Sequence, residues 1–151
     1  KATGNQSPAA IAAKSKWMAG DLKAFAARYG VPYARNPWFP VNTMMLMRGA
    51  VAMQKENRFG AYADAIFHAM WIEPQNLNDP QVIGMVLTKA GFEPKHLLAA
   101  IEHQPVKDEL RANTEEAVSR GVFGAPTFFV GDRMFFGQDR LDFVEEALNA
   151  A

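Results

Sequence analysis

The chain has 151 residues, of which 49% are apolar and 21% charged, the composition of an ordinary globular domain. Sixteen basic side chains balance 16 acidic ones, so the formal net charge is zero and no basic excess favours nucleic acid or anionic membranes. There is no cysteine, which excludes disulfides, thiolate metal sites and a cysteine nucleophile in these residues, and no apolar run reaches the roughly 18 residues that span a bilayer.

Helical patterns fill the first two thirds of the chain. The first helix is expected from Ser7, a candidate N-cap followed by Pro8, to Tyr29, and Gly30 ends it. Three prolines make residues 31–40 a loop. Further helices are expected at 42–55 with Asn42 as the cap, 58–71, 79–91 opened by Asp79 and Pro80, 93–103 and 105–121.

Two groups of apolar residues stand out on the expected helices. One forms a single face of the third helix, and the other is a methionine cluster on the second helix, which we interpret as core filler rather than as a cofactor site. The members are Phe59, Tyr62, Ala63, Ile66, Phe67 and Met70 in the first group, and Met44, Met45, Met47 and Met53 in the second.

The pattern changes near the C-terminus. Two short, apolar, β-rich runs, 127–130 and 134–136, flank Gly131-Asp132 and predict a β-hairpin. Asp139 is then expected to cap a final helix that ends near Asn149. Because an isolated hairpin is a marginal sheet, we expect an α/β domain in which the remaining strands lie upstream of Lys1.

The strongest local signal for chemistry lies around the hairpin. Pro126 begins the first strand, where either a trans proline at a sheet edge or a cis Ala125-Pro126 bond is possible; the cis form would leave the Ala125 backbone free for an extended ligand. After the second strand, Phe136-Gly137-Gln138-Asp139 leads into a helix start, where backbone N–H groups attract carboxylates. The alternative interpretation of this segment is an ordinary aspartate N-cap.

The remaining candidates are weaker. His68, His96 and His103 lack the spacing of metal ligands, so we interpret them as surface or core histidines and expect no metal site. No phosphate-binding loop, dinucleotide-binding fingerprint or zinc-protease motif is present.

The segments GVFGAPTFFV and FFGQDR resemble the C-terminal part of a thioredoxin-fold group, the 2-hydroxychromene-2-carboxylate isomerases and kappa-class glutathione transferases. The N-terminal segment KATGNQSPAAIAAKSKWMAGDL, with Asn5 and Lys14, and NPWFPVNTMMLMRGA are similar to the isomerase branch. The resemblance implies one thioredoxin-like domain over residues 1–151. It is predominantly helical, with an all-helical insertion at about 7–103 and a thioredoxin part at about 105–151.

The resemblance also implies glutathione as cofactor and a small aromatic substrate. Transient addition of the thiolate would isomerise 2-hydroxychromene-2-carboxylate during aromatic-compound degradation. It implies a cis Ala125-Pro126 bond, a cytoplasmic homodimer, and no catalytic residue in this chain, because the thiol-activating serine is expected in an absent N-terminal β-α-β segment. The implied glutathione-binding residues are Asn5, Lys14, Trp17, Ala125, Pro126, Phe136, Gly137, Gln138 and Asp139, and the implied substrate-binding residues are Lys1 and Asn42.

Two other functions remain open. A kappa-type transferase or peroxidase would hold glutathione in the same way and differ in what its pocket admits. A non-catalytic thioredoxin-like domain would keep the fold with a degenerate site. A disulfide oxidoreductase is disfavoured, because the chain has no Cys-x-x-Cys motif.

Overall fold

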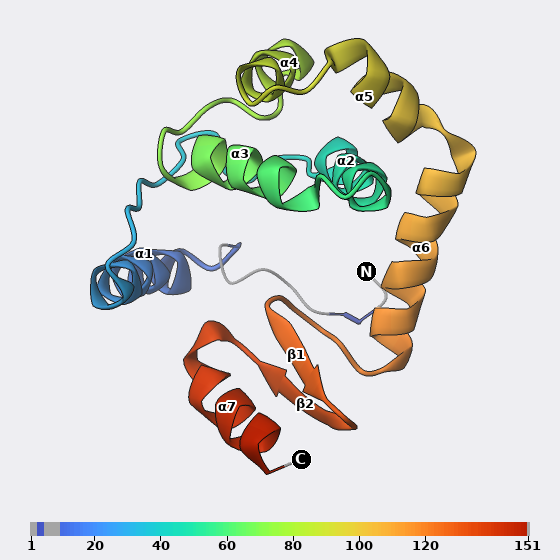
Figure 1. Ribbon diagram of the computed structural model, residues 1–151. Coiled ribbons are helices and arrows are strands. Elements are labelled where there is room, and N and C mark those ends of the chain that lie inside the picture. The colour runs from blue at the N-terminus through green and yellow to red at the C-terminus, as the bar shows by residue number, and fades with distance from the viewer. Residues whose placement is uncertain (1–2, 5–9, 151) are drawn as a thin grey trace. The chain divides into compact units, whose positions relative to one another are not determined.

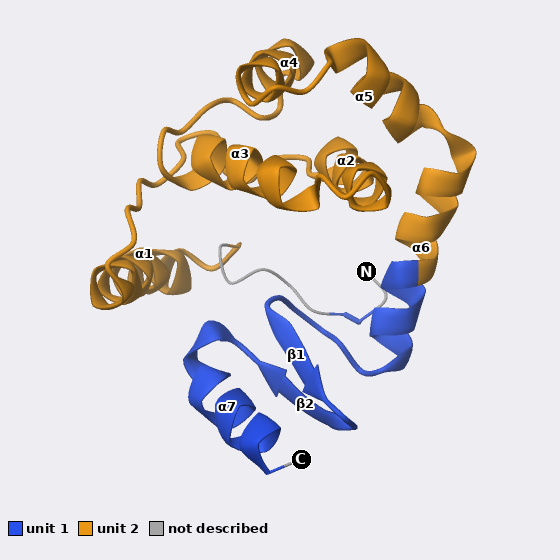
Figure 2. Cartoon of the chain, in the orientation of Figure 1, with its two compact units in different colours: residues 1–7, 113–151 blue, residues 8–112 orange. Residues whose placement is uncertain are grey.

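The computed structural model describes residues 3–4 and 10–150. The chain divides into two compact units, one formed by Pro8–Ala112 and the other by Lys1–Ser7 with Asn113–Ala151 (Figure 2). We call them the helical unit and the hairpin unit. Helix α6 (Gln104–Ser119) runs through the boundary, so its first half belongs to the helical unit and its second half to the hairpin unit.

The helical unit is a succession of helices joined by short loops (Figure 1). Helix α4 begins as expected: the Asp79 side chain accepts a hydrogen bond from Gln81 N–H at 2.8 Å, and Pro80 occupies the first turn. Gly30 ends α1 in the left-handed conformation, also as expected. The helices preceding α6 are α1 (Ala12–Tyr29), α2 (Met44–Lys55), α3 (Phe59–Trp71), α4 (Pro80–Lys89) and α5 (Pro94–Glu102).

Two of the expected helix starts are displaced. Helix α1 begins at Ala12 rather than at Ser7, because Ile11 is the extended residue at its N-cap; Ser7 and Pro8 lie outside the described residues. The N-cap of α2 is Thr43, so the helix begins one residue later than an Asn42 cap requires. Asn42 still contributes there, since its side-chain oxygen accepts a hydrogen bond from Met44 N–H at 3.1 Å.

The hydrophobic core of the helical unit lies among α2, α3, α4 and α5. Tyr62 of α3 is buried in it, and its hydroxyl donates a hydrogen bond to the Leu46 carbonyl of α2 at 2.9 Å. Burial raises the pKa of this phenol. The ring meets Phe92 edge to face, with 5.8 Å between the centroids. The core also contains Val51, Ala52, Met53, Ala69, Met70, Leu77, Ile83, Leu87, Leu97, Ile101 and Val106.

The core is narrower than the apolar periodicity predicts. On α3, Phe59 and Phe67 are exposed, Phe67 by 63%, whereas Tyr62 and Met70 are buried. The methionine cluster divides similarly: Met53 is buried and Met45 packs against the core, but Met44 and Met47 are exposed. The interpretation of the methionine cluster as core filler is therefore wrong for Met44 and Met47, because neighbouring helices cover only part of the apolar face.

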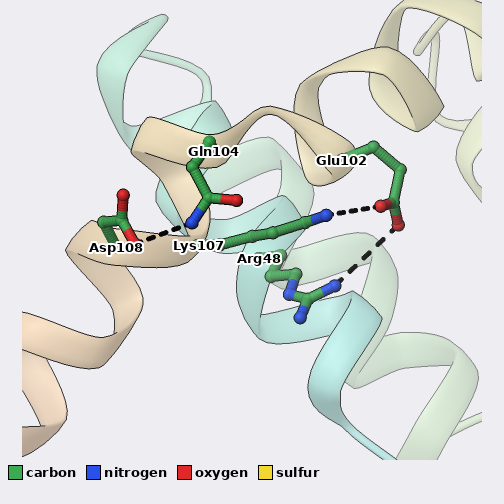
Figure 3. Close-up of polar contacts among 5 residues, drawn as sticks. All are labelled: Arg48, Glu102, Gln104, Lys107 and Asp108. Carbon is green, nitrogen blue, oxygen red and sulfur yellow. Dashed lines mark hydrogen bonds and ion pairs between the residues drawn. The ribbon is translucent and has the colours of Figure 1, made fainter.

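The junction of α5 with α6 is held by polar contacts (Figure 3). The Lys107 ammonium donates a hydrogen bond to Glu102 Oε2 at 2.6 Å, and Arg48 Nη1 of α2 lies 3.8 Å from Glu102 Oε1. These contacts, the Lys107 hydrogen bond first, lower the pKa of Glu102. One turn into α6, the Gln104 amide donates to Asp108 at 2.8 Å. The charged side chains thus bind the end of α5 to the first turns of α6.

The hairpin unit contains the C-terminal half of α6, strands β1 (Thr127–Val130) and β2 (Arg133–Phe136), and helix α7 (Leu141–Asn149) (Figure 1). The strands form an antiparallel hairpin, as the sequence predicts, and Thr127 lies opposite Phe136. Helix α7 packs on β1. At the end of α6, the Arg120 guanidinium lies 3.6 Å from the centroid of the Phe129 ring, which joins this helix to the hairpin.

The described residues contain no helix long and apolar enough to cross a bilayer. They also contain no group of three or more histidine, aspartate or glutamate side chains placed to hold a metal ion. His68 instead lies 3.3 Å from Glu73, and His96 lies 2.6 Å from Glu56.

Candidate functional site

Several of the predicted binding residues, those of the segment 125–139, lie near the start of β1. The Ala125-Pro126 peptide bond is cis, as the resemblance implies, and Phe39-Pro40 is a second cis bond that the sequence analysis did not predict. Because Thr127 pairs with Phe136, continuing the register places residue 126 opposite residue 137 and residue 125 opposite residue 138. The Gly137 N–H donates a hydrogen bond to the Pro126 carbonyl at 3.0 Å, which closes this end of the ladder.

Two aromatic rings and two glycines shape this end of the hairpin. The rings of Phe123 and Phe136 lie with their centroids 4.7 Å apart, and a Cβ on Gly124 would come within 2.7 Å of the Phe136 ring. Gly137 has φ = 100°, a conformation that favours glycine, and a side chain there would meet the Asp139 carboxylate. Sequence reasoning missed the roles of Phe123 and Gly124; a glycine two residues before the strand proline was the only available signal.

The backbone of Ala125 is open to a ligand. Within the described part of the chain, neither its N–H nor its carbonyl makes a hydrogen bond. In the same described part, β1 pairs with β2 alone, so its other edge has no partner strand. An extended peptide that lies beside residue 125 would find one backbone donor and one backbone acceptor there.

Asp139 does not cap the final helix, so that prediction is wrong. A short 3-10 helix, η2 (Gln138–Arg140), precedes α7, and the N-cap of α7 is Arg140 without a side-chain hydrogen bond. The Asp139 carboxylate instead accepts a hydrogen bond from the neighbouring Arg140 guanidinium at 2.6 Å. The extra turn moves the helix start beyond the reach of Asp139 and leaves its carboxylate paired with a cation that sequence reasoning did not single out.

The exposed Asp139–Arg140 pair presents both signs of charge next to Gly137 and Gln138. The two side chains are 46% and 49% exposed, so both charges remain accessible to a ligand. A molecule with an ammonium and a carboxylate on one carbon matches such a pair, since each of its groups finds the opposite charge.

The other predicted site residues lie elsewhere in the chain. Lys14 and Trp17 are exposed on neighbouring turns of α1, in the helical unit, with Trp17 exposed by 70%. Asn42 also belongs to the helical unit, where its N–H donates a hydrogen bond to the Asn78 side chain at 3.0 Å. Lys1 and Asn5 lie outside the described residues. The structure therefore brings together residues 125–139. The predicted binding roles of the other five residues remain predictions.

A helical unit joined to a β-hairpin that opens with a cis proline is consistent with the thioredoxin-like α/β class. A family model described as a DSBA-like thioredoxin domain matches residues 1–149. The chain belongs to the family of DSBA-like thioredoxin domains. This confirms the predicted fold class.

Curated relatives agree with the resemblance seen in the sequence. The 2-hydroxychromene-2-carboxylate isomerase of Sphingobium xenophagum is 31% identical, over 97% of this chain and 75% of that protein. Human glutathione S-transferase kappa 1 is 26% identical, over 98% of this chain and 72% of that protein. A solved structure of a 2-hydroxychromene-2-carboxylate isomerase matches with a TM-score of 0.79 and 25% identity, over 97% of this chain and 71% of that one.

Proposed function

We propose that the protein is a glutathione-dependent isomerase of the 2-hydroxychromene-2-carboxylate type. The observation that carries the proposal is the cis Ala125-Pro126 bond at the start of the hairpin, in the same compact unit as the exposed Asp139–Arg140 pair. Relatives named as isomerases of this substrate at about 30% identity support the substrate class.

The hairpin residues suit the peptide part of glutathione. The cysteinyl backbone would pair with the N–H and carbonyl of Ala125, as an added strand does. The γ-glutamyl end would place its ammonium on Asp139 and its carboxylate on Arg140 and the Gln138 segment. Because the Asp139–Arg140 pair is exposed, sharing its charges with a ligand requires little further desolvation.

Residues outside the segment 125–140 complete the proposal. Lys14 and Asn5 would hold the glycine carboxylate of glutathione with Trp17 nearby, and Asn42 and Lys1 would face the aromatic substrate. Bound glutathione supplies a thiolate that adds to a conjugated carbon and leaves again after the ring has opened and a bond has rotated. The residues proposed here bind and orient the two molecules, and a chain without cysteine is consistent with a nucleophile supplied by glutathione.

Calorimetric titration with glutathione tests the binding site. Asp139→Asn removes the charge and keeps the size of the side chain, and should weaken binding by about tenfold or more, the effect of losing one charge-assisted hydrogen bond. Asp132→Asn, in the exposed hairpin turn, is the matched control and should bind as the wild type does. Wild-type affinity in the Asp139 variant would exclude the proposed role of that carboxylate.

The activity is tested with the substrate itself. The absorbance of 2-hydroxychromene-2-carboxylate should change on addition of protein with glutathione, and not on addition of protein alone. A kappa-type transferase is the second candidate, which the similarity to human glutathione S-transferase kappa 1 favours. Conjugation of glutathione to an aromatic halide without isomerisation would indicate a transferase. Glutathione binding with neither isomerisation nor conjugation would indicate a non-catalytic domain.

A further inference from the structure

The segment that leads into β1 is held on both sides of Ala125. The Thr127 hydroxyl donates a hydrogen bond to the Gly124 carbonyl at 2.6 Å, and the Pro126 carbonyl accepts one from Gly137 N–H at 3.0 Å. Ala125 itself is exposed, and within the described part of the chain its own backbone groups form no hydrogen bond. This residue therefore lies between two carbonyls that each already have a donor.

The surroundings of Gly124 show why the Thr127 hydroxyl matters. Glycine has more backbone freedom than other residues, so its conformation depends on what contacts it. The Phe136 ring packs against Gly124, since a Cβ there would lie 2.7 Å from the ring, and the Thr127 hydroxyl holds the Gly124 carbonyl. Thr127 is partly buried and lies in the hairpin opposite Phe136. Its hydroxyl thus anchors a flexible position to a strand.

We propose that Thr127 is a positioning residue of the glutathione site. Its hydroxyl holds Gly124 so that the backbone of Ala125 has the conformation that pairs with the ligand before the ligand arrives. A segment that is ordered in advance loses less conformational freedom on binding, and the affinity is higher for that reason. The inference rests on the proposed glutathione site, and Thr127 acts there through Ala125 and not by touching the ligand.

Calorimetric titration with glutathione compares two substitutions of Thr127. Thr127→Val keeps the branched shape and removes the hydroxyl, so the affinity should fall about fivefold, the effect of one neutral hydrogen bond. Thr127→Ser keeps the hydroxyl, so its affinity should stay close to that of the wild type. Thr88→Val is the matched control, because it removes a hydroxyl that donates to the Gly84 carbonyl of α4 at 2.8 Å, and it should bind as the wild type does.

The order of the two variants separates positioning from mere support of the strand. If Thr127 only stabilised β1, valine would be the milder substitution, because it keeps the β-branched shape that strands favour. Serine would then be the more harmful one. Positioning through the hydroxyl predicts the opposite order for glutathione affinity. Equal affinities of the two variants, or weaker binding by Thr127→Ser, would overturn the proposal.

NMR relaxation of the Ala125 amide, measured without glutathione, tests the mechanism separately. Its order parameter should lie near the rigid-backbone value of about 0.85 in the wild type and in Thr127→Ser, and should fall in Thr127→Val. An unchanged order parameter in Thr127→Val would overturn the proposal. If the order parameter falls but the wild type binds no glutathione, the result contradicts the proposed function and still supports the positioning of Ala125 by Thr127.

Discussion

Single side chains show how closely α2 and α3 pack. Gly49 of α2 faces the Tyr62 ring, and a Cβ at position 49 would come within 2.7 Å of Tyr62 Cζ. The same phenol donates its hydrogen bond to the Leu46 carbonyl, so any displacement of the ring also disturbs a buried hydrogen bond. Position 49 therefore requires glycine because the Tyr62 ring lies so close to α2, and not because of the backbone conformation at that position.

Gly49 and Gly84 form a matched pair for a stability test. Gly49→Ala should lower the free energy of unfolding by about 1–3 kcal/mol, because a well-packed site must rearrange. Gly84→Ala should raise it by about 0.5–1 kcal/mol, because alanine favours a helix interior and the new methyl group meets no atom within 4 Å. Urea denaturation measures both changes. Effects of the same sign would contradict this account of the packing.

Asn36 is the buried polar residue of the helical unit, with 1% of its surface exposed. Its amide donates to the Gln75 carbonyl at 3.0 Å, and its oxygen accepts from Trp38 N–H at 2.9 Å. It thus ties the proline-rich loop to the segment after α3, and no buried side-chain nitrogen or oxygen of the described residues lacks a hydrogen-bond partner.

At the scale of elements, local signals predicted more than periodicity did. Three boundaries follow from the local chemistry of a few residues, and each is confirmed. They are the start of α4 at Asp79 and Pro80, the end of α1 at Gly30, and the turn between β1 and β2 at Gly131-Asp132. Periodicity alone did not predict which residues of an apolar helix face are buried, because burial depends on which neighbouring element covers that face. Phe67 and Met47 satisfy the helical pattern and are nevertheless exposed.

The candidate site was predicted to a similar extent. The hairpin and the converging segment 125–139 follow from the strand pattern and from the resemblance. The Asp139–Arg140 pair does not, because a cap and a neighbouring ion pair have the same sequence signature, and only the extra 3-10 turn before α7 separates them.

The contact between α5 and α6 gives a prediction for the dependence of stability on pH. The pKa of Glu102 is lower in the folded protein than in the unfolded chain, chiefly because of its hydrogen bond with Lys107. Its contribution to stability is therefore present above the unfolded pKa and is lost as the pH falls through the folded pKa. Glu102→Gln should lower Tm slightly at neutral pH, because exposed ion pairs are weak, and the difference from wild type should vanish in acid.

Thermal denaturation between about pH 7 and about pH 2.5 measures this effect. Glu115→Gln, an exposed position on α6, is the control and should follow the wild type throughout. A difference between Glu102→Gln and wild type that persists at the acid end would mean that the substitution acts through packing or helix propensity instead of charge.

At the scale of the whole molecule, the two units differ in how much core they contain. The buried apolar side chains of the described residues belong to the helical unit, with the single exception of Ala147 on α7. The hairpin unit is also short, and segments of its size bury a smaller fraction of their surface than larger ones do. Local stability should therefore be lower in the hairpin unit than in the helical unit.

Hydrogen–deuterium exchange tests this difference together with the glutathione site. Amides of β1, β2 and α7 should exchange faster than those of α2 and α3, because fewer buried contacts oppose their opening. Saturating glutathione should slow exchange in residues 124–140 more than in α2, since a ligand stabilises the state that binds it, by about 2.7 kcal/mol at a hundredfold excess over Kd.

Tryptophan fluorescence reports the unfolding of the helical unit separately, because Trp17, Trp38 and Trp71 all lie in that unit. Equal protection of β1 and α2 without ligand would show that the two units open together, and slowing confined to the helical unit would place glutathione away from the hairpin.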